Sequence, residues 1–187
     1  NALLDDCLEL GNIHQIEATA AYRKGLFHVQ DISSQLCCRV AKPVFNETVI
    51  DVCAAPGGKT FTMAEIMANR GKLYSFDLYD GKVSMIRTGA ERLGLSIVEA
   101  AVHDATVYDA GIPLADKVLC DTVCSGLGVI RRKPEIKYKE MKNIEQLPIV
   151  QKHILETASK YVKVGGTLIY STCTLNRSEN EDVVEKF

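Results

Sequence analysis

Short apolar runs alternate with longer segments of helical period along most of this 187-residue chain. Runs with the composition of strands lie at 48–53, 72–78, 97–103, 117–122 and 167–173. Apolar residues at helical spacing lie between them, at about 31–41, 59–69, 80–94 and 146–164. This alternation is typical of a parallel sheet with helices on both faces. We therefore expect one doubly wound α/β domain over 28–187, preceded by a lead-in segment at 1–27.

Two features mark the expected ends of the last helices. Gly165 and Gly166 follow the fourth helical segment and predict its C-terminal cap. The final stretch, 176–187, is typical of a helix start, with Asn176 or Ser178 as its cap and acidic residues in its first turn. A doubly wound sheet usually continues after such a helix, so we expect a sheet that lacks its C-terminal strands.

Composition excludes several classes of protein. Lys and Arg number 22 and Asp and Glu 24, which gives a net charge of −2, and 47% of the residues are hydrophobic. This composition is typical of a globular domain. No apolar stretch approaches the roughly 18 residues of a membrane-spanning helix, and the N-terminus lacks the order of a signal peptide. The seven cysteines are odd in number and lack zinc-site spacing. We expect a cytoplasmic monomer with reduced thiols and no metal.

A glycine-containing loop, DVCAAPGGKT at 51–60, follows the first strand and opens a helix. Open α/β sheets bind nucleotides at this place, outside the carboxyl ends of the strands. A phosphate-binding P-loop is excluded because Cys53 stands where its first glycine is required, and the dinucleotide G-x-G-x-x-G pattern is absent. The loop therefore predicts close approach by a ligand without a pyrophosphate.

Acidic residues end three successive strands after this loop. Asp77 follows Gly58 by 19 positions, and Asp104 and Asp121 end the next two strands. Three carboxylates at one sheet edge suit a ligand with a ribose, an adenine amino group and an ammonium, as in S-adenosylmethionine. The alternative, that these residues are turn formers and caps, stays open for each of them singly.

Two of the cysteines are placed for chemistry. Cys124 lies in a glycine-containing loop after the fourth strand, and Cys173 ends the fifth strand just before the expected helix start. Both sulfurs should lie at the sheet edge that carries the glycine loop, and a helix N-terminus lowers the pKa of a thiol. Lone cysteines are more often small buried hydrophobic residues, which is our expectation for Cys7, Cys37, Cys38 and Cys120.

Four segments together carry a family resemblance: 29–36 (VQDISSQL), 51–60 (DVCAAPGGKT), 124–138 (CSGLGVIRRKPEIKY) and 170–187 (YSTCTLNRSENEDVVEKF). With them the chain resembles the Sun-type RNA (cytosine-5)-methyltransferases, closest to the bacterial ribosomal small-subunit branch. The resemblance runs from about Gly25 to the end of the chain. It implies a Rossmann-like class I methyltransferase fold, S-adenosylmethionine as methyl donor, and a cytosine in structured RNA, with ribosomal RNA favoured, as acceptor.

By position, the resemblance implies a set of residues that bind the cofactor. Asp77 would hold its ribose and Asp104 its adenine, while Asp121 would lie between cofactor and base. The loop residues that would line it are Cys53, Ala54, Ala55, Pro56, Gly57, Gly58 and Lys59. For Lys59, a solvated position in the first helical turn is the alternative.

The same resemblance implies catalytic roles for the two loop cysteines. Cys173 corresponds to the nucleophile, and Cys124 to the cysteine that assists product release. A thiol is needed because C5 of cytosine is a weak nucleophile until a thiolate adds to C6 and pushes electron density onto C5. Asp121 would hydrogen-bond the N3/N4 edge of the base.

One departure from the family pattern leaves other functions open. The family has proline before the fourth-strand cysteine, whereas Val123 stands here, and we expect valine to loosen or redirect that turn. A non-catalytic module that binds cofactor or RNA, a methyltransferase acting on tRNA and, less favoured, a nucleotide hydrolase remain alternatives.

A basic run follows Cys124 and bears on RNA binding. Within 131–142, six basic residues face two acidic ones, Glu135 and Glu140, which gives a local charge of +4. The basic residues are Arg131, Arg132, Lys133, Lys137, Lys139 and Lys142. Phosphate contact is our interpretation, with a plain solvated face as the alternative. Because the family's RNA-binding domain is absent from these residues, we expect cofactor binding with only weak RNA binding.

Overall fold

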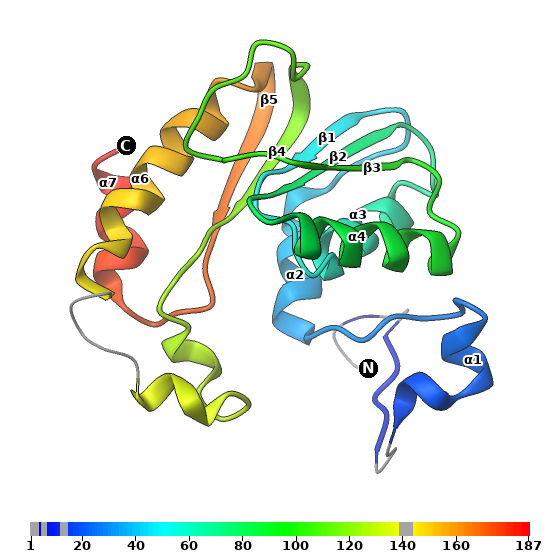
Figure 1. Cartoon of the computed structure of the whole chain (residues 1–187). Coiled ribbons are helices and arrows are strands. Elements are labelled where there is room, and N and C mark those ends of the chain that lie inside the picture. The colour runs from blue at the N-terminus through cyan, green and yellow to red at the C-terminus, as the bar shows by residue number, and fades with distance from the viewer. Residues whose placement is uncertain (1–3, 5–6, 12–14, 139–143) are drawn as a thin grey trace.

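The computed structural model, which describes residues 4, 7–11, 15–138 and 144–187, contains a five-stranded sheet in the order β3-β2-β1-β4-β5 (Figure 1). Every neighbouring pair of strands runs parallel. The strands are β1 (Thr48–Asp51), β2 (Lys72–Asp77), β3 (Val98–Val102), β4 (Ala115–Asp121) and β5 (Val162–Ser171). The predicted parallel, Rossmann-like sheet is confirmed.

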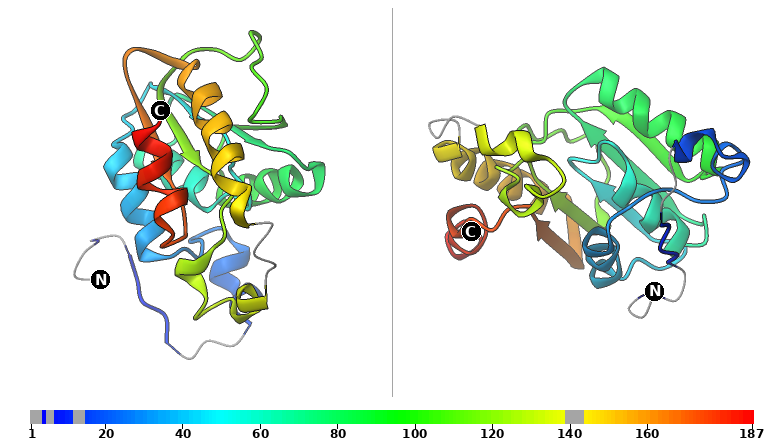
Figure 2. Two further views of the ribbon diagram at one scale, coloured as in Figure 1. Left: turned by 90° about the vertical axis from the view of Figure 1, so that its left-hand side faces the viewer. Right: turned by 90° about the horizontal axis from the view of Figure 1, so that it is seen from below.

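Helices cover both faces of the sheet. In the left view of Figure 2, α6 and α7 lie in front of the sheet, and α2 lies behind it. The helices are α2 (Ile32–Ala41), α3 (Gly58–Ile66), α4 (Asp80–Leu93), α6 (Leu147–Ser159) and α7 (Glu181–Glu185). Short 3₁₀ turns are η1 (Ile16–Ala18), η2 (Leu127–Val129), η3 (Pro134–Tyr138) and η4 (Arg177–Glu179), and the lead-in also holds α1 (Ala20–Arg23). None of the described helices is both long and apolar enough to cross a bilayer.

Two hydrophobic cores lie on the two sides of the sheet, because successive side chains of a strand point to opposite faces. Val49 of β1 packs in one core with residues of α2, α3 and α4, among them Cys38, Phe61 and Ile86. The next residue, Ile50, packs in the other core, whose helical members are Ile154, Leu155, Ala158 and Val183. The central strands are thereby buried on both faces, as a doubly wound fold requires, while β3 and β5 at the edges are more exposed.

The predicted cap at Gly165 and Gly166 is wrong. Helix α6 ends at Ser159, and both glycines lie inside β5. The apolar Val162 continues the helical spacing of the sequence, but the chain there already pairs with β4, opposite Ala115. Apolar spacing therefore did not distinguish the end of the helix from the start of a buried strand.

The two glycines form a bulge in β5 instead of a cap. The pairing register with β4 shifts between Ala115, opposite Val162, and Lys117, opposite Thr167. Gly165 has φ +81°, and a Cβ at Gly166 would lie 2.9 Å from the carbonyl oxygens of Asp116 and Lys163. Extra residues in one strand are the definition of a bulge, and glycine fits where backbones approach this closely.

The C-terminal segment is helical in two parts. Asn176 caps η4 as expected, its side chain accepting a hydrogen bond from the Ser178 N–H at 3.3 Å. The helix does not continue, because Asn180 adopts φ −117° and ψ −95° before α7 begins. Its side chain donates instead to the carbonyl oxygens of Thr174 and Asn176, both at 3.1 Å.

Candidate functional site

The carboxyl ends of the parallel strands bring four aspartates to one edge of the sheet. Asp51, Asp77 and Asp121 are the last residues of β1, β2 and β4. Asp104 follows the end of β3 by two residues. Three of the four are the predicted strand-end acids; Asp51 was not singled out, although its place directly before the glycine loop was the signal for it.

The loop between β1 and α3 is shaped by its glycines. Gly57 has φ +110°, and a Cβ there would lie 2.4 Å from the Phe61 ring, so only glycine fits. Within the loop, the N–H of Ala54 donates to the Phe76 carbonyl at 2.8 Å. Cys53 is half-buried, and burial raises the pKa of its thiol to about 12. These contacts present a backbone turn to the site, with no reactive thiol in it.

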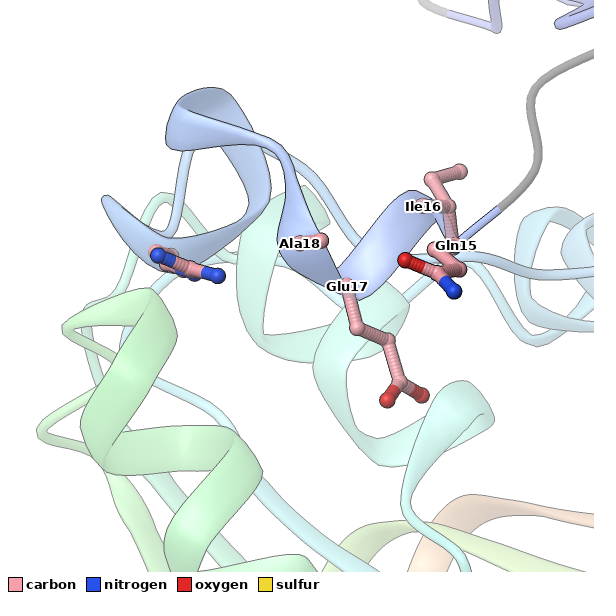
Figure 3. Close-up of a pocket in the computed structure, with 5 residues that line it drawn as sticks. Gln15, Ile16, Glu17 and Ala18 are labelled. Carbon is pink, nitrogen blue, oxygen red and sulfur yellow. The ribbon is translucent and has the colours of Figure 1, made fainter.

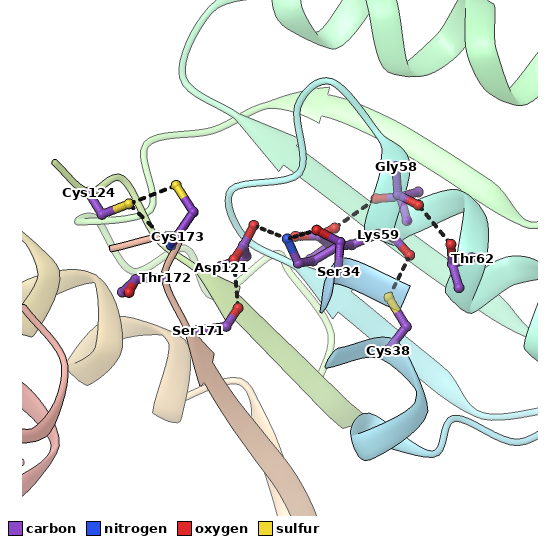
Figure 4. A network of polar contacts seen from close by, with 12 residues as sticks. Ser34, Cys38, Gly58, Lys59, Thr62, Asp121, Cys124, Ser171, Thr172 and Cys173 are labelled. Carbon is purple, nitrogen blue, oxygen red and sulfur yellow. Dashed lines mark hydrogen bonds and ion pairs between the residues drawn. The ribbon is translucent and has the colours of Figure 1, made fainter. Parts of the chain in front are cut away.

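Lys59 forms an ion pair inside the site rather than a solvated surface contact. Its Nζ lies 2.6 Å from Oδ2 of Asp121 and 3.5 Å from Oγ of Ser34, and its side chain is 17% exposed (Figure 4). The other oxygen of Asp121 accepts from the Ser171 hydroxyl at 2.6 Å. Burial alone would lower the pKa of Lys59, but the charge and hydrogen bond of Asp121, together with the charge of Asp51, outweigh burial and raise that pKa. The alternative of a solvated lysine is therefore wrong.

Asp51 is 1% exposed and is close enough to Asp121 and Lys59 for their charges to act on it. Its Oδ2 accepts from the Thr60 hydroxyl at 2.8 Å, and its Oδ1 has no hydrogen-bond partner among the described residues. Burial raises the pKa of its carboxyl to about 7, although the hydrogen bond from Thr60 opposes this. The site therefore contains a carboxyl group whose charge changes near neutral pH.

Asp77 and Asp104 differ in their surroundings. Asp77 is 7% exposed; its Oδ1 accepts from the Tyr79 N–H at 3.3 Å and lies 3.5 Å from Nζ of Lys82. Asp104 is exposed and accepts from both the N–H and the hydroxyl of Thr106, at 2.9 and 2.7 Å. These bonds from Thr106 lower the pKa of Asp104. Asp104 thus makes the contacts of a turn former, and Asp77 holds a buried carboxylate at the edge.

The two loop cysteines lie side by side. Their sulfurs are 3.1 Å apart, and the N–H of Cys173 donates to Sγ of Cys124 at 3.3 Å (Figure 4). Cys173 is exposed and Cys124 is half-buried. Both thiols are free, since a disulfide needs sulfurs about 2.05 Å apart. The sheet edge therefore presents one accessible sulfur supported by a second.

The two sulfurs have opposite acidities. The hydrogen bond from Cys124 lowers the pKa of the Cys173 thiol to about 6, in spite of burial and the charge of Asp121, while Lys59 assists. The same hydrogen bond, together with burial, raises the pKa of Cys124. Cys173 is thus the more acidic thiol of the pair, and a thiolate is the form of cysteine that acts as a nucleophile.

The remaining cysteines follow the expectation in three cases of four. Cys7, Cys38 and Cys120 are buried, and Cys37 is half-buried. Burial raises the pKa of Cys37 despite a hydrogen bond with Ser171. None of these four thiols is solvent-exposed.

The basic run after Cys124 is exposed where the structure describes it. Arg131, Arg132, Lys133 and Lys137 are solvent-exposed, and Arg132 forms an ion pair with Asp31 at the start of α2. Lys139 and Lys142, with Glu140, lie outside the described residues. The described part of the segment after Cys124 therefore exposes three basic residues besides Arg132, namely Arg131, Lys133 and Lys137.

A hollow of about 600 Å³ lies elsewhere, along the lead-in segment, lined by Gln15, Ile16, Glu17, Ala18 and Arg23 (Figure 3). It shares no residue with the glycine loop or the cysteine loops and contains none of the expected site residues. Among the described residues, no group of three His, Cys, Asp or Glu side chains is placed to hold a metal ion.

The chain is similar to known proteins in sequence and in fold. The family model described as 16S rRNA methyltransferase RsmB/F matches residues 38–187. The probable ribosomal RNA small subunit methyltransferase B of Bacillus subtilis is 45% identical over 92% of this chain and 39% of its own length. The ribosomal RNA small subunit methyltransferase F of Escherichia coli is 36% identical over 96% of this chain and 37% of its own. The chain thus spans about two fifths of these relatives.

A solved structure shares the fold. The crystal structure of NSun6 from Pyrococcus horikoshii with SFG superposes with a TM-score of 0.85 and 34% identity, over 93% of this chain and 45% of that one.

Proposed function

Because the chain belongs to the family described as 16S rRNA methyltransferase RsmB/F, we propose that it transfers a methyl group from S-adenosylmethionine to C5 of a cytosine in ribosomal RNA. Membership confirms the resemblance drawn from the sequence motifs. The observation that carries the proposal is the pair of sulfurs 3.1 Å apart, one of them exposed, beside the Lys59–Asp121 ion pair. A cytoplasmic, monomeric protein acting on RNA is part of the same proposal.

The residues at the sheet edge fit the cofactor of this family. Among the described residues, Oδ2 of Asp77 has no hydrogen-bond partner, so it is free to accept from a ribose hydroxyl. Asp104 is exposed near the same edge and would meet the adenine. The turn at Gly57, together with Cys53, Ala54, Ala55, Pro56, Gly58 and Lys59, would line the rest of the site. When bound, S-adenosylmethionine supplies an electrophilic methyl group.

The side chains of the site suggest how the base is activated. The Cys173 thiolate would add to C6 of the cytosine, which raises the electron density at C5. Asp121 would accept from the N4 amino group or from a protonated N3 and stabilise the adduct. Lys59 forms an ion pair with that carboxylate, with its Nζ 2.6 Å from Oδ2. Once the methyl group is on C5, the C5 proton would leave to solvent and the C6–sulfur bond would break, with its electron pair returning to the Cys173 sulfur. Cys124 would assist this release.

Trapping the adduct tests this proposal directly. The protein is incubated with methyl-labelled S-adenosylmethionine and small-subunit rRNA containing 5-fluorocytosine, whose fluorine cannot leave as a proton does. We expect a covalent protein–RNA band on a denaturing gel, which is lost in Cys173→Ala. In Cys124→Ala the band should remain, because Cys173 makes the bond to C6.

The other outcomes each name a different function. A band that is lost in Cys124→Ala but kept in Cys173→Ala would reverse the two roles. A band with tRNA in place of rRNA would identify the other acceptor. Cofactor and RNA binding without any adduct would favour a non-catalytic binding module, and Val123→Pro would then be the first variant to test for restored activity.

A further inference from the structure

A buried carboxylate, unused by the proposed chemistry, lies behind the two cysteine loops. Glu179 of η4 is completely buried. Its Oε2 accepts from the Ser125 N–H at 2.8 Å and from Nε2 of Gln151 at 3.0 Å, and its Oε1 accepts from Nδ2 of Asn176 at 3.0 Å. No cation is among these described contacts. An ionised group buried in this way is expensive unless hydrogen bonds compensate it.

The hydrogen bonds keep this carboxylate ionised. Burial would raise the pKa of Glu179, but the bonds from Ser125, Asn176 and Gln151 outweigh it and lower that pKa. Buried charges of this kind are weak sources of stability, because a well-packed apolar side chain usually serves as well. Its position suggests a role in geometry instead.

The carboxylate and its neighbour fix the Cys124 loop on both sides of the cysteine. The Ser125 N–H is held by Glu179, and the carbonyl oxygen of Val123 accepts from Nε2 of Gln151 at 2.9 Å. Gln151 is itself completely buried in α6. Cys124 therefore lies between two anchored peptide groups, although valine stands in place of the expected proline.

The same cluster joins this loop to the Cys173 loop. The hydroxyls of Ser125 and Thr174 lie 2.7 Å apart and both residues are buried. The Gly128 N–H donates to the Cys173 carbonyl at 3.0 Å, and a Cβ at Gly128 would lie 2.8 Å from that oxygen. These contacts hold the backbone of the Cys124 loop close to the backbone of the Cys173 loop.

We propose that Glu179 is a positioning residue, whose buried carboxylate holds the Cys124 loop so that the Cys124 thiol directs its hydrogen at the Cys173 sulfur. The catalytic meaning of this contact rests on the proposed function. The contact itself does not, since it concerns only two thiols of this chain. An amide in place of the carboxylate leaves one acceptor oxygen for three donors, the Ser125 N–H and the side-chain amides of Gln151 and Asn176. The hold on the Cys124 loop then weakens, so the Cys124 sulfur moves away from Cys173.

The pKa of Cys173 can be used to measure the contact between the two thiols. Cys173 is influenced by Cys124, by the opposing charge of Asp121 and by the favourable charge of Lys59. Neither Asp121 nor Lys59 is among the described contacts of Glu179, so a change at Glu179 reaches Cys173 through the loops. Loss of the Cys124 hydrogen bond should raise the pKa of Cys173 from about 6 toward the ordinary value of a thiol.

The test measures the rate of Cys173 alkylation by iodoacetamide against pH, with the site resolved by peptide mass spectrometry. In Glu179→Gln we expect the midpoint to rise by at least about one pH unit, because a thiol reacts as its thiolate. Glu181→Gln is the matched control, since Glu181 is an exposed glutamate two residues away, and its midpoint should not move. An unmoved midpoint in folded Glu179→Gln would overturn the proposal.

A double-mutant cycle shows whether Glu179 acts through Cys124. Cys124→Ala alone should raise the midpoint, and adding Glu179→Gln to it should raise it no further. An additional rise of equal size would mean that Glu179 acts by another route, which also overturns the proposal. If Glu179→Gln does not fold, Gln151→Met removes the anchor of Val123 from α6, and the same outcomes apply.

Fold and function are monitored separately. The melting temperature and the affinity for S-adenosylhomocysteine, whose expected site does not include Glu179, verify the fold. If the midpoint moves as expected but no RNA adduct forms, the positioning role stands and the proposed function fails. If the RNA adduct forms but the midpoint does not move in Glu179→Gln, the proposed function stands and the positioning role fails.

Discussion

The position of Asp51 at the end of a central strand determines the pKa of its carboxyl group. The last residue of a central strand is covered by the helices on both faces, and Asp51 is 1% exposed there. Its one described side-chain hydrogen bond, from Thr60, does not match the loss of hydration, so burial raises the pKa of Asp51 to about 7. The folded protein therefore holds a proton at Asp51 at pH values where the unfolded chain has lost it.

This proton makes the stability of the protein fall as the pH rises. Because the pKa of Asp51 is raised from 3.8 to about 7, the folded state binds more protons than the unfolded state between these values. In Asp51→Asn, which cannot ionise, the free energy of unfolding should match the wild type at pH 4 and exceed it at pH 8. The difference is at most about 4 kcal/mol. Urea unfolding at several pH values measures it.

Asp116 provides a control with the opposite sign. Hydrogen bonds from Lys163 and from the Thr48 N–H lower the pKa of Asp116, so its contribution to stability is present above the ordinary value and lost as the pH falls. Asp116→Asn should be less stable than the wild type at neutral pH, and the two should converge below about pH 4. A gap between Asp51→Asn and the wild type that is constant with pH would contradict the assignment for Asp51.

The bulge in β5 is distant from the functional site, so a substitution there should change the stability of the protein and leave the site intact. It lies opposite Ala115–Lys117, at the amino end of β4, whereas Asp121 ends that strand. Four residues of strand place about 13 Å between the bulge and the site. Because a Cβ at Gly166 would meet two backbone oxygens at 2.9 Å, Gly166→Ala should destabilise the protein by ~1–3 kcal/mol. Thermal unfolding measures this loss, and cofactor affinity below the transition should be unchanged.

Gly81→Ala is the control for this variant. A Cβ at Gly81 meets nothing within 4 Å, and Gly81 lies in α4, where alanine is favoured over glycine by ~0.5–1 kcal/mol. The two substitutions add the same methyl group and should shift the melting temperature in opposite directions. Equal shifts would mean that the bulge relaxes around Gly166, and that the glycine is not required there.

The elements show what the sequence could and could not predict. The alternation of apolar runs and helical segments predicts all five strands, because a buried parallel strand needs little besides apolar composition. Four of them agree within two residues at each end, and β5 begins five residues before its predicted start. The end of α6 was missed because Val162 satisfies both periods. The strand-end acids and both loop cysteines follow from topology. The roles of Lys59 and Glu179 do not, because each depends on a partner distant in the sequence, Asp121 and Ser125.

Over the whole molecule, charge is unevenly distributed. The net charge is −2, yet the described part of the segment after Cys124 exposes Arg131, Lys133 and Lys137. Arg132 is already paired with Asp31. Phosphate contacts release condensed counterions, so the salt dependence of RNA affinity counts the cations that bind phosphate, whatever the net charge. The distribution of charge therefore predicts weak, salt-sensitive RNA binding centred on this segment.

The salt dependence of RNA binding tests this interpretation. Replacing Arg131 and Lys133 together by glutamine should reduce the slope of log affinity against log salt by about 1.4, at about 0.7 for each contact with single-stranded RNA. Fluorescence anisotropy between about 50 and 200 mM salt gives the slope. Affinity for S-adenosylhomocysteine should not change, because neither residue is among those expected to line the cofactor site.

Lys24→Gln tests whether any lost charge has the same effect. Lys24 is exposed in the lead-in segment, outside the basic run, so its removal changes the net charge without removing an expected phosphate contact. If Lys24→Gln changes the slope as much per charge as the double variant does, RNA affinity depends only on the overall charge of the protein. An unchanged slope in the double variant would mean that the segment after Cys124 is a solvated face, and nanomolar binding at physiological salt would contradict weak RNA affinity altogether.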